Sequence, residues 1–270
     1  MVHVLSTFDA NYAKYWYVQV LQIALQSSED VTFHVIANKD VLDSLHMHEL
    51  ERALSALGVS IGVDFALYDV DECIGKSKYR IAMHMDDANV SWISEPTYYR
   101  LYAPEVLECD RCIYLDVDVL VRCDLSELMH MDIGDNEVAM GANYLKPTGL
   151  NHKYFCAGIA VMDLQRMRDD DCVRKFEQAS NELVLTEHDQ TILNNVCTIH
   201  ELPFEYACSQ YRWWCNGDEP IVEYPKLVHF ITSRKPWKNN KVVVRKFFDE
   251  WWAYNNTITG MMQMLALGLF

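Results

Sequence analysis

The chain has 270 residues, of which 50% are hydrophobic and 23% charged, and its formal net charge is −16 at pH 7. This composition excludes a disordered chain, and the length suits one domain or one domain with a small subdomain. The negative charge disfavours nucleic acid as a partner and attachment through a polybasic membrane surface, since both need a basic face.

The sequence contains no segment that predicts export or a membrane span. Its start, Met1–Leu5, lacks the basic and long apolar regions of a signal peptide, and no apolar stretch reaches the roughly 18 residues of a spanning helix. The nine cysteines are scattered, so we expect reduced thiols in a cytoplasmic protein. Cys109 and Cys112 form a single C-x-x-C pair, and without a second pair a zinc site is disfavoured.

The first third of the chain alternates predicted strands and helices. Apolar runs predict strands over Val2–Ser6, Val31–Ala37 and Val59–Tyr68. Amphipathic periodicity predicts helices over Asn11–Gln26 and Asp40–Leu57. This order predicts a parallel sheet with right-handed crossover connections.

The middle of the chain continues the alternation. The expected elements are a helix, three strands and two further helices, at Tyr98–Leu107, at Cys112–Leu115, Glu137–Ala142 and Phe155–Met162, and at Leu164–Ser180 and His188–Asn195.

The last part of the chain is less regular. The aromatic, cysteine-containing segment Tyr206–Asp218 predicts either a buried loop or an aromatic wall against a sugar face. Val242–Tyr254 predicts a closing helix. The apolar segment Thr257–Phe270 either docks on the domain or lies at a membrane or partner interface.

Two aspartates follow the predicted strand Cys112–Leu115. Because positions two apart in an extended chain share a face, we expect Asp116 and Asp118 to point the same way, at the end of the sheet where open α/β folds bind ligands. Two adjacent carboxylates resist joint ionisation unless a cation lies between them, and hard divalent cations take carboxylate oxygens. His229 follows another apolar run, so it is either a third metal ligand or an ordinary core histidine.

Six short stretches, in one order along the chain, resemble the family 8 glycosyltransferases, which include bacterial lipopolysaccharide galactosyl- and glucosyltransferases and glycogenin. The stretches are Phe8–Tyr12, Tyr98–Leu101, Tyr114–Val121, Phe155–Gly158, His188–Asn194 and His229–Trp237.

The resemblance implies an α/β fold of the glycosyltransferase A type, with a Rossmann-like, mostly parallel twisted sheet flanked by helices. We expect this catalytic domain over residues 1–250 and a helical, apolar tail over 251–270. The implied reaction moves galactose or glucose, with retention, from a UDP-sugar to a glycan or glycolipid of the cell envelope, such as lipopolysaccharide. Mn²⁺ or Mg²⁺ is the implied metal. Peripheral contact with the inner face of the membrane and the oligomeric state stay open.

The resemblance also implies roles for single residues. By this likeness Asp116, Asp118 and His229 hold the metal, and Asp9 and Asn11 contact the uridine. Helix capping is the plainer alternative for Asp9 and Asn11, since both residue types are preferred N-caps.

Other implied roles concern the sugar and the diphosphate. Arg100 and Asp189 are expected to contact the donor hexose, Gln190 to lie near the anomeric carbon on the acceptor side, and Lys235 to reach the diphosphate. Asp189 and Gln190 are therefore the catalytic candidates. The expected donor and metal site as a whole comprises Asp9, Asn11, Arg100, Asp116, Val117, Asp118, Cys156, Ala157, Asp189, Gln190, His229, Thr232 and Lys235.

Two positions depart from the family pattern. Cys156 stands where the family usually has Asn, and a thiol is a much weaker hydrogen-bonding group than an amide. Thr232 stands where the family usually has Gly, which lets backbone amides approach a diphosphate.

Two other functions stay open at this stage. One is a phosphohydrolase resembling the haloacid dehalogenases, in which Asp116 would be the nucleophile, although that family carries its Asp-x-Asp near the N-terminus. The other is a UDP-sugar-binding protein with weak activity, suggested by Cys156 and Thr232.

Overall fold

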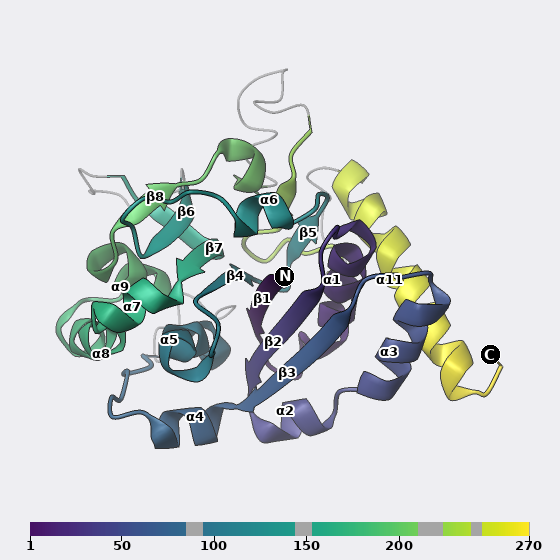
Figure 1. Cartoon of the computed structure of the whole chain (residues 1–270), viewed down its shortest axis with the longest axis horizontal. Helices are drawn as coiled ribbons and strands as arrows, with labels where there is room; N and C mark the ends of the chain where they lie inside the picture. Colours follow the sequence, from purple (N-terminus) through teal and green to yellow (C-terminus); the bar gives the residue numbers. More distant parts are fainter. Residues whose placement is uncertain (85–93, 144–152, 210–223, 239–244, 270) are drawn as a thin grey trace.

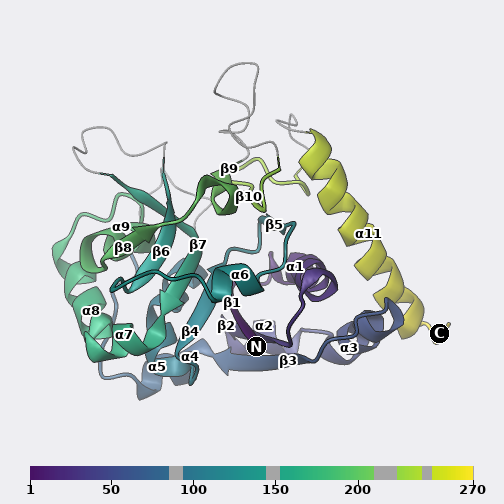
Figure 2. The same ribbon diagram turned by 45° about the horizontal axis from the view of Figure 1, so that its top comes forward.

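The computed structural model describes residues 1–84, 94–143, 153–209, 224–238 and 245–269. Within these residues, seven strands form a central sheet in the order β3-β2-β1-β4-β7-β6-β8, and three short strands form a second sheet in the order β5-β10-β9. Figures 1 and 2 show the central sheet between two groups of helices.

The first half of the sheet is parallel, as predicted. Its strands are β1 (Val2–Thr7), β2 (Val31–Ala37), β3 (Val63–Asp69) and β4 (Arg111–Leu115). β1 and β2 are buried over almost their whole length because helices cover both faces, which is the reason that they read as continuous apolar runs.

In the second half of the sheet a single strand, β7, runs opposite to the others. The strand β7 (Phe155–Asp163) pairs antiparallel with both β4 and β6 (Val138–Ala142), and β8 (Ile199–Glu201) is parallel to β6. The start of β7 therefore lies beside the end of β4.

The second sheet brings a distant segment to the same place. β10 (Leu227–His229) pairs antiparallel with β5 (Val119–Val121) and parallel with β9 (Cys208–Ser209). His229 is opposite Val119 in this register, which places it next to the two aspartates.

The helices form two layers. One layer packs over the first half of the sheet and consists of α1 (Ala13–Gln26), α2 (Lys39–Asp43), α3 (Met47–Ala56) and α11 (Arg245–Ala266). The short elements α6 (Ser126–Met129) and the 3-10 helix η3 (Phe204–Tyr206) pack into the same core cluster as that layer. The second core cluster is built from α4 (Val70–Lys76), the 3-10 helix η2 (Glu95–Tyr102), α5 (Ala103–Val106), α7 (Leu164–Asp169), α8 (Cys172–Glu182) and α9 (Asp189–Val196).

Several predicted boundaries were wrong. The helix predicted over Asp40–Leu57 is split into α2 and α3, because the backbone at His46 leaves the helical region and its amide donates to the Tyr17 hydroxyl. The helix predicted over Leu164–Ser180 is split into α7 and α8 at Asp171, whose φ is 52°. The segment predicted as a helix over Tyr98–Leu107 is mostly 3-10, and the strand predicted from Val59 begins at Val63. The short helices α4 and α6 were not predicted.

The C-terminal helix α11 runs without a break from Arg245 to Ala266, across position 250. α11 packs on α1 and α3, as Figure 1 shows, and buries Ile258 and Leu265. Within the described residues, no helix combines the length and the hydrophobicity of a membrane span. The eight cysteines described are all free. Most of the predicted aromatic segment Tyr206–Asp218 lies outside the described residues.

Candidate active site

A cavity of about 410 Å³ opens where β1 and β4 end and β7 begins. Every predicted site residue except Asn11 lines this cavity. Asn11 is exposed. Its backbone nitrogen donates to Asp9 Oδ1 at 2.9 Å, in a turn that leads into α1. Neither Asp9 nor Asn11 is the N-cap of α1, since that position is Tyr12.

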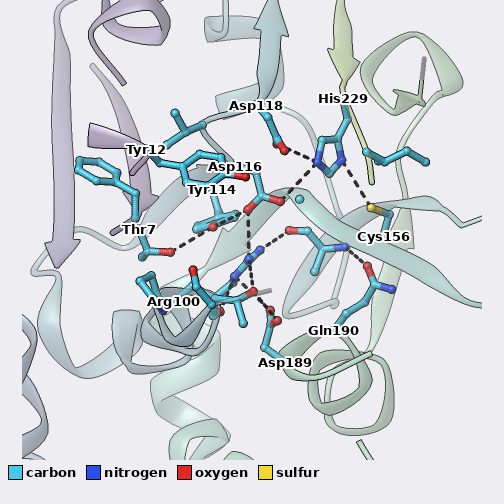
Figure 3. A pocket seen from close by; sticks show the side chains of 18 of the residues that line it. Thr7, Tyr12, Arg100, Tyr114, Asp116, Asp118, Cys156, Asp189, Gln190 and His229 are labelled. Carbon is cyan, nitrogen blue, oxygen red and sulfur yellow. Dashed lines mark hydrogen bonds and ion pairs between the residues drawn. The ribbon is translucent and has the colours of Figure 1, made fainter. Parts of the chain in front are cut away.

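Asp116, Asp118 and His229 meet at the centre of the cavity (Figure 3). His229 Nε2 lies 3.0 Å from Asp118 Oδ1 and 3.4 Å from Asp116 Oδ2. One ligand atom from each of the three side chains lies within 4.8 Å of the others. The three side chains were predicted together, and the structure brings them together.

Gly158 makes this convergence sterically feasible. A Cβ atom at this position would lie 2.1 Å from His229 Cε1 and 2.6 Å from Asp116 Oδ2. Its backbone also contacts the segment that carries the two aspartates, because Asp116 N donates to Gly158 O at 2.9 Å. Glycine is therefore required here by close approach rather than by backbone conformation.

A cationic side chain pairs with one oxygen of each carboxylate. Arg100 Nη2 and the Tyr114 hydroxyl donate to Asp116 Oδ1 at 3.1 Å and 2.6 Å, and the ammonium of buried Lys235 pairs with Asp118 Oδ2. Asp118 Oδ1 is buried and accepts no hydrogen bond from the described residues, although His229 Nε2 is near. The remaining carboxylate oxygens thus face the imidazole. Two carboxylates and one imidazole fit a hard divalent cation, and the buried Asp118 Oδ1, which accepts no hydrogen bond from the described residues, is available as a ligand atom.

The charges of this cluster are strongly coupled. Burial opposes ionisation of Asp116 and Asp118, but the charges of Arg100 and Lys235, together with His229, hold the pKa of both carboxyls below the usual range. Burial alone would lower the pKa of His229, yet the neighbouring carboxylates raise it well above the ordinary value. A divalent cation would replace the imidazolium as the positive partner of these carboxylates.

A second network joins the cluster of Asp116, Asp118 and His229 to helix α9. Arg100 is 3% exposed; its Nε lies 3.2 Å from Asp189 Oδ2 and its Nη1 donates to Ala157 O at 2.6 Å. Thr97 Oγ1 donates to Asp189 Oδ1 at 2.6 Å. Burial raises the pKa of Asp189 in spite of the Arg100 charge. Arg100 therefore bridges Asp116 and Asp189, and it holds both carboxylates in fixed orientations.

Gln190 lies at the start of α9 beside the cavity. Its Oε1 accepts a hydrogen bond from Ala157 N at 2.9 Å, which fixes the orientation of the amide. Asn194 donates to Gln190 O at 2.8 Å and to Phe155 O at 2.9 Å, so α9 is tied to the start of β7.

The two departures from the family pattern both lie at the cavity. Cys156 Sγ is 3.7 Å from His229 Nδ1. Thr232 has φ of 64°, in the left-handed region that favours glycine. Both departures therefore concern residues that line the cavity.

Sequence reasoning missed several residues that support the site. Tyr114, which also lies under the Arg100 guanidinium at 3.7 Å from ring centroid to Cζ, is two positions before Asp116, so strand parity could have found it. Gln19 was missed as well; its Nε2 donates to Asp116 O at 2.8 Å from helix α1, and no local pattern signals such a contact.

Comparison with known proteins agrees with this geometry. Residues 3–241 match the sequence profile described as "Glycosyl transferase family 8". General stress protein A of Bacillus subtilis (strain 168) is 25% identical over 94% of this chain and 93% of its own length. The lipopolysaccharide 1,2-glucosyltransferase of Escherichia coli (strain K12) is 25% identical over 53% of this chain and 49% of its own length.

Other relatives are much longer than the aligned region. A probable glycosyl transferase Gly of Streptococcus gordonii is 27% identical over 60% of this chain, and the match spans 24% of that protein.

Among solved structures, the galactosyltransferase LgtC in complex with donor and acceptor sugar analogues superposes with a TM-score of 0.70 at 20% identity, over 95% of this chain and 96% of the other. GlyE of Streptococcus pneumoniae TIGR4 superposes with a TM-score of 0.67 at 17% identity, over 99% of this chain and 64% of the other.

The solved structures establish the expected glycosyltransferase A-type fold. The profile covers most of the chain and includes each of the residues that converge on the cavity. The chain therefore belongs to glycosyltransferase family 8.

Proposed function

We propose that this glycosyltransferase moves galactose or glucose from a UDP-sugar, with Mn²⁺ or Mg²⁺ bound by Asp116, Asp118 and His229. The observation that carries the proposal is the orientation of the two carboxylates. Each has one oxygen paired with a cation and the other directed toward His229 Nε2. A metal at this place would supply positive charge to the departing diphosphate.

Lys235 is suited to assist the leaving group. Its ammonium is buried beside Asp118 and also donates to Phe230 O at 2.6 Å, so the chain holds a positive charge at the edge of the metal cluster. Negative charge builds up on the leaving phosphate as the glycosidic bond breaks, and a preorganised cation stabilises that charge.

Asp189 is proposed to orient and stabilise the donor sugar rather than to attack it. Thr97 and Arg100 hold its two oxygens, and this restrains the carboxylate in one orientation beside the cavity. A carboxylate placed there favours the oxocarbenium-like charge of the sugar in the transition state.

Gln190 is proposed as a positioning residue near the anomeric carbon. A neutral amide is a poor nucleophile, and its oxygen is already engaged by Ala157 N. Asp9 at the rim is the proposed contact for the uridine.

The phosphohydrolase alternative is not favoured. The family profile covers residues 3–241, and Asp116 follows the fourth strand of the chain instead of the first. Arg100, Tyr114 and His229 also surround the Asp116 carboxylate, which leaves it poorly placed as a nucleophile.

The acceptor is proposed to be a glycan or glycolipid of the cell envelope. This part rests on the similarity to the E. coli relative, a lipopolysaccharide 1,2-glucosyltransferase, of which the match spans 49%. A cytoplasmic location is proposed on the scattered, free cysteines, which are typical of a reducing compartment. Contact with the inner membrane face remains a prediction; Trp252 on α11 is 40% exposed.

A UDP-release assay with UDP-galactose, UDP-glucose and UDP-N-acetylglucosamine tests the donor and the metal together. We expect slow hydrolysis of UDP-galactose or UDP-glucose that requires Mn²⁺, stops with EDTA and is lost in Asp116→Ala. Turnover that persists in EDTA, or that is unchanged in Asp116→Ala, would contradict the proposal.

The same assay distinguishes an efficient enzyme from a weakly active UDP-sugar-binding protein. Cys156→Asn replaces a weak hydrogen-bonding group next to His229 by an amide with two donors and an acceptor. A large gain in turnover would mean that the natural site is an impaired transferase, whereas a fall in turnover would mean that Cys156 serves this chain's own donor.

A further inference from the structure

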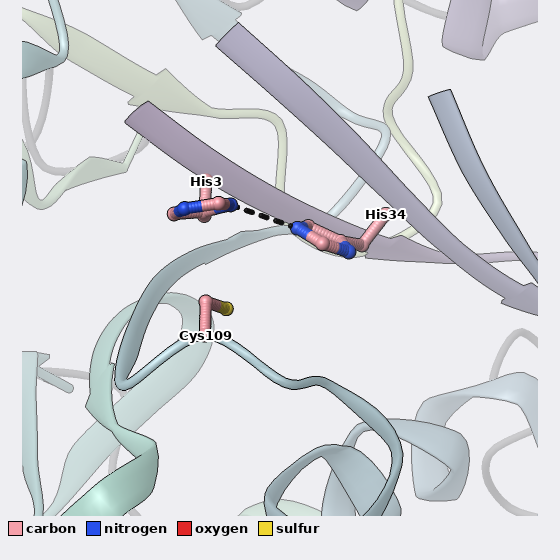
Figure 4. A group of neighbouring side chains, drawn as sticks. All are labelled: His3, His34 and Cys109. Atoms are coloured by element: carbon pink, nitrogen blue, oxygen red, sulfur yellow. Dashed lines mark hydrogen bonds between the residues drawn. The ribbon is translucent and has the colours of Figure 1, made fainter. Parts of the chain in front are cut away.

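Two histidines and one cysteine form a separate cluster on the central sheet. His3 lies on β1 and His34 on β2, while Cys109 lies in the loop that leads into β4 (Figure 4). His3 and Leu5 share a face of β1, and Leu5 packs in the core cluster opposite the one that contains Val4 and α1.

The cluster is distinct from the catalytic cavity. None of its residues lines that cavity, whereas Thr7, the last residue of β1, does. Four residues of extended strand separate His3 from Thr7, which corresponds to roughly 13 Å.

The three side chains direct donor atoms at one another. His3 Nδ1 lies 3.0 Å from His34 Nε2, and one ligand atom from each of His3, His34 and Cys109 lies within 4.8 Å of the other two. A metal ion bound to three such ligands would need only small side-chain rotations, since bonds from zinc to nitrogen and sulfur are about 2.0–2.3 Å long.

Tyr68 orients the inner imidazole. Its hydroxyl lies 3.1 Å from His34 Nδ1, and the two rings are stacked. When the hydroxyl accepts a hydrogen bond from Nδ1–H, Nε2 carries the lone pair and faces His3. Histidine ligands of metals have this arrangement as a rule, with the outer ring nitrogen bonded to an oxygen. Burial lowers the pKa of both imidazoles, which favours the neutral form that binds metals, and it raises the pKa of the Cys109 thiol to about 11, so that the thiolate would form only as a metal binds.

We propose that His3, His34 and Cys109 form a second metal site, selective for a borderline or soft transition-metal ion of the Zn²⁺ class. Two imidazoles and a thiolate suit such an ion, while Mn²⁺ and Mg²⁺ prefer the oxygen-rich set around Asp116. The Cys109 thiol would release its proton to solvent on binding. Water would fill the fourth position, because His3 and Cys109 are only partly buried.

A metal at this place would cross-link the strands that carry the catalytic site. It would join β1, β2 and the loop before β4. Thr7 is the last residue of β1 and Asp116 directly follows β4, and both line the catalytic cavity. The role inferred is therefore structural: the ion would stabilise the parallel half of the sheet. This inference does not depend on the donor or the reaction proposed above.

The test uses the reduced, metal-free full chain and Co²⁺ as a spectroscopic stand-in for Zn²⁺, with excess Mg²⁺ present for the oxygen-rich site. A thiolate bound to Co²⁺ gives a charge-transfer absorption, so the measurement reports only sites that contain cysteine. We expect about one equivalent of Co²⁺ to produce this band, and Zn²⁺ to displace it. No band in the wild-type protein would overturn the proposal.

Three cysteine variants identify the ligand. Cys109→Ser should abolish the band. Cys156→Ser tests the thiol beside His229, a candidate ligand of the site in the cavity, and it should retain the band. Cys73→Ser is a matched control with a half-buried thiol outside both sites. A band that survives in Cys109→Ser, or that disappears in Cys156→Ser, would assign the signal elsewhere and overturn the proposal.

A histidine variant keeps the test decisive if Cys109→Ser fails to fold. His3 is only partly buried, so His3→Gln should fold, and it should weaken Co²⁺ binding at least about tenfold. Zn²⁺ should also raise the melting temperature of the wild-type protein more than that of His3→Gln. Equal Co²⁺ affinity and equal Zn²⁺ stabilisation in both proteins would mean that the two histidines form only a hydrogen-bonded pair.

Discussion

Gly158→Ala would drive a methyl group into the candidate metal ligands. The new Cβ would lie 2.1 Å from His229 Cε1, while ordinary contact begins near 3.4 Å, so the imidazole would have to retreat by about 1.3 Å. Asp116 Oδ2, at 2.6 Å, would have to move as well. A displacement of about 1 Å in a catalytic site can lower the rate about 10²-fold. We therefore expect donor hydrolysis and Mn²⁺ affinity to fall at least about 100-fold.

Two other glycines separate ligand displacement from general strain. Gly141→Ala creates an equally severe contact, 2.0 Å from Ala207 Cβ, but outside the cavity. Overpacking costs about 1–3 kcal/mol of unfolding free energy, so we expect both variants to melt earlier by similar amounts. Gly260→Ala, on α11, meets no atom of the described residues within 4 Å and should be neutral or slightly stabilising.

The assay is isothermal titration with Mn²⁺, together with UDP release, on all three variants well below their melting temperatures. Only Gly158→Ala should lose metal affinity and turnover. If it binds Mn²⁺ within about twofold of the wild type, or if Gly141→Ala loses as much affinity, the assignment of the metal ligands is wrong.

Three further predictions concern stability. Thr232→Gly should raise the unfolding free energy in urea by up to about 1 kcal/mol, because it relieves a left-handed backbone at φ 64°; a lower stability would contradict that reading. Arg100→Met should cost about 3–5 kcal/mol, since it removes the buried cation that pairs with buried Asp189 and partly buried Asp116, whereas Arg174→Met breaks an exposed ion pair and should cost less than about 1 kcal/mol; similar losses would refute this contrast. Hydrogen bonds from Ser28 lower the pKa of Asp124 against partial burial, so this stability is present above the unfolded pKa and is lost as pH falls below about 4. Ser28→Ala should therefore lower the urea midpoint more at pH 7 than below pH 4, and an equal loss at both would contradict this cause.

The sequence was sufficient for the parallel half of the fold and for the centre of the site. β1, β2 and β4 are buried on both faces, so their apolar runs are readable, and a strand that ends in a carboxylate marks the edge of the sheet. The family resemblance supplied the association of His229 with Asp116 and Asp118.

Long-range contacts were not predictable from local patterns. Gln19 reaches Asp116 O across 97 residues, and the break before α3 depends on a hydrogen bond between His46 and Tyr17. His3 and His34 belong to different strands, and Cys109 belongs to a distant loop, so the only local signal was a C-x-x-C pair that lacks partners nearby in the sequence. The second cysteine of that pair shows the limit of spacing rules, because Cys112 is buried in β4 and takes no part in the cluster.

The most direct test of the central claim is calorimetric titration of UDP into the protein with and without Mn²⁺, repeated with Asp118→Asn. The substitution replaces one buried carboxylate oxygen by an amide nitrogen and removes the negative charge that pairs with Lys235 and His229. The account predicts that UDP binds tightly only when Mn²⁺ is present, and that Asp118→Asn weakens this binding at least about 100-fold. Equal UDP affinity with and without Mn²⁺, or an unchanged affinity in Asp118→Asn, would contradict a metal-dependent donor site at the end of β4.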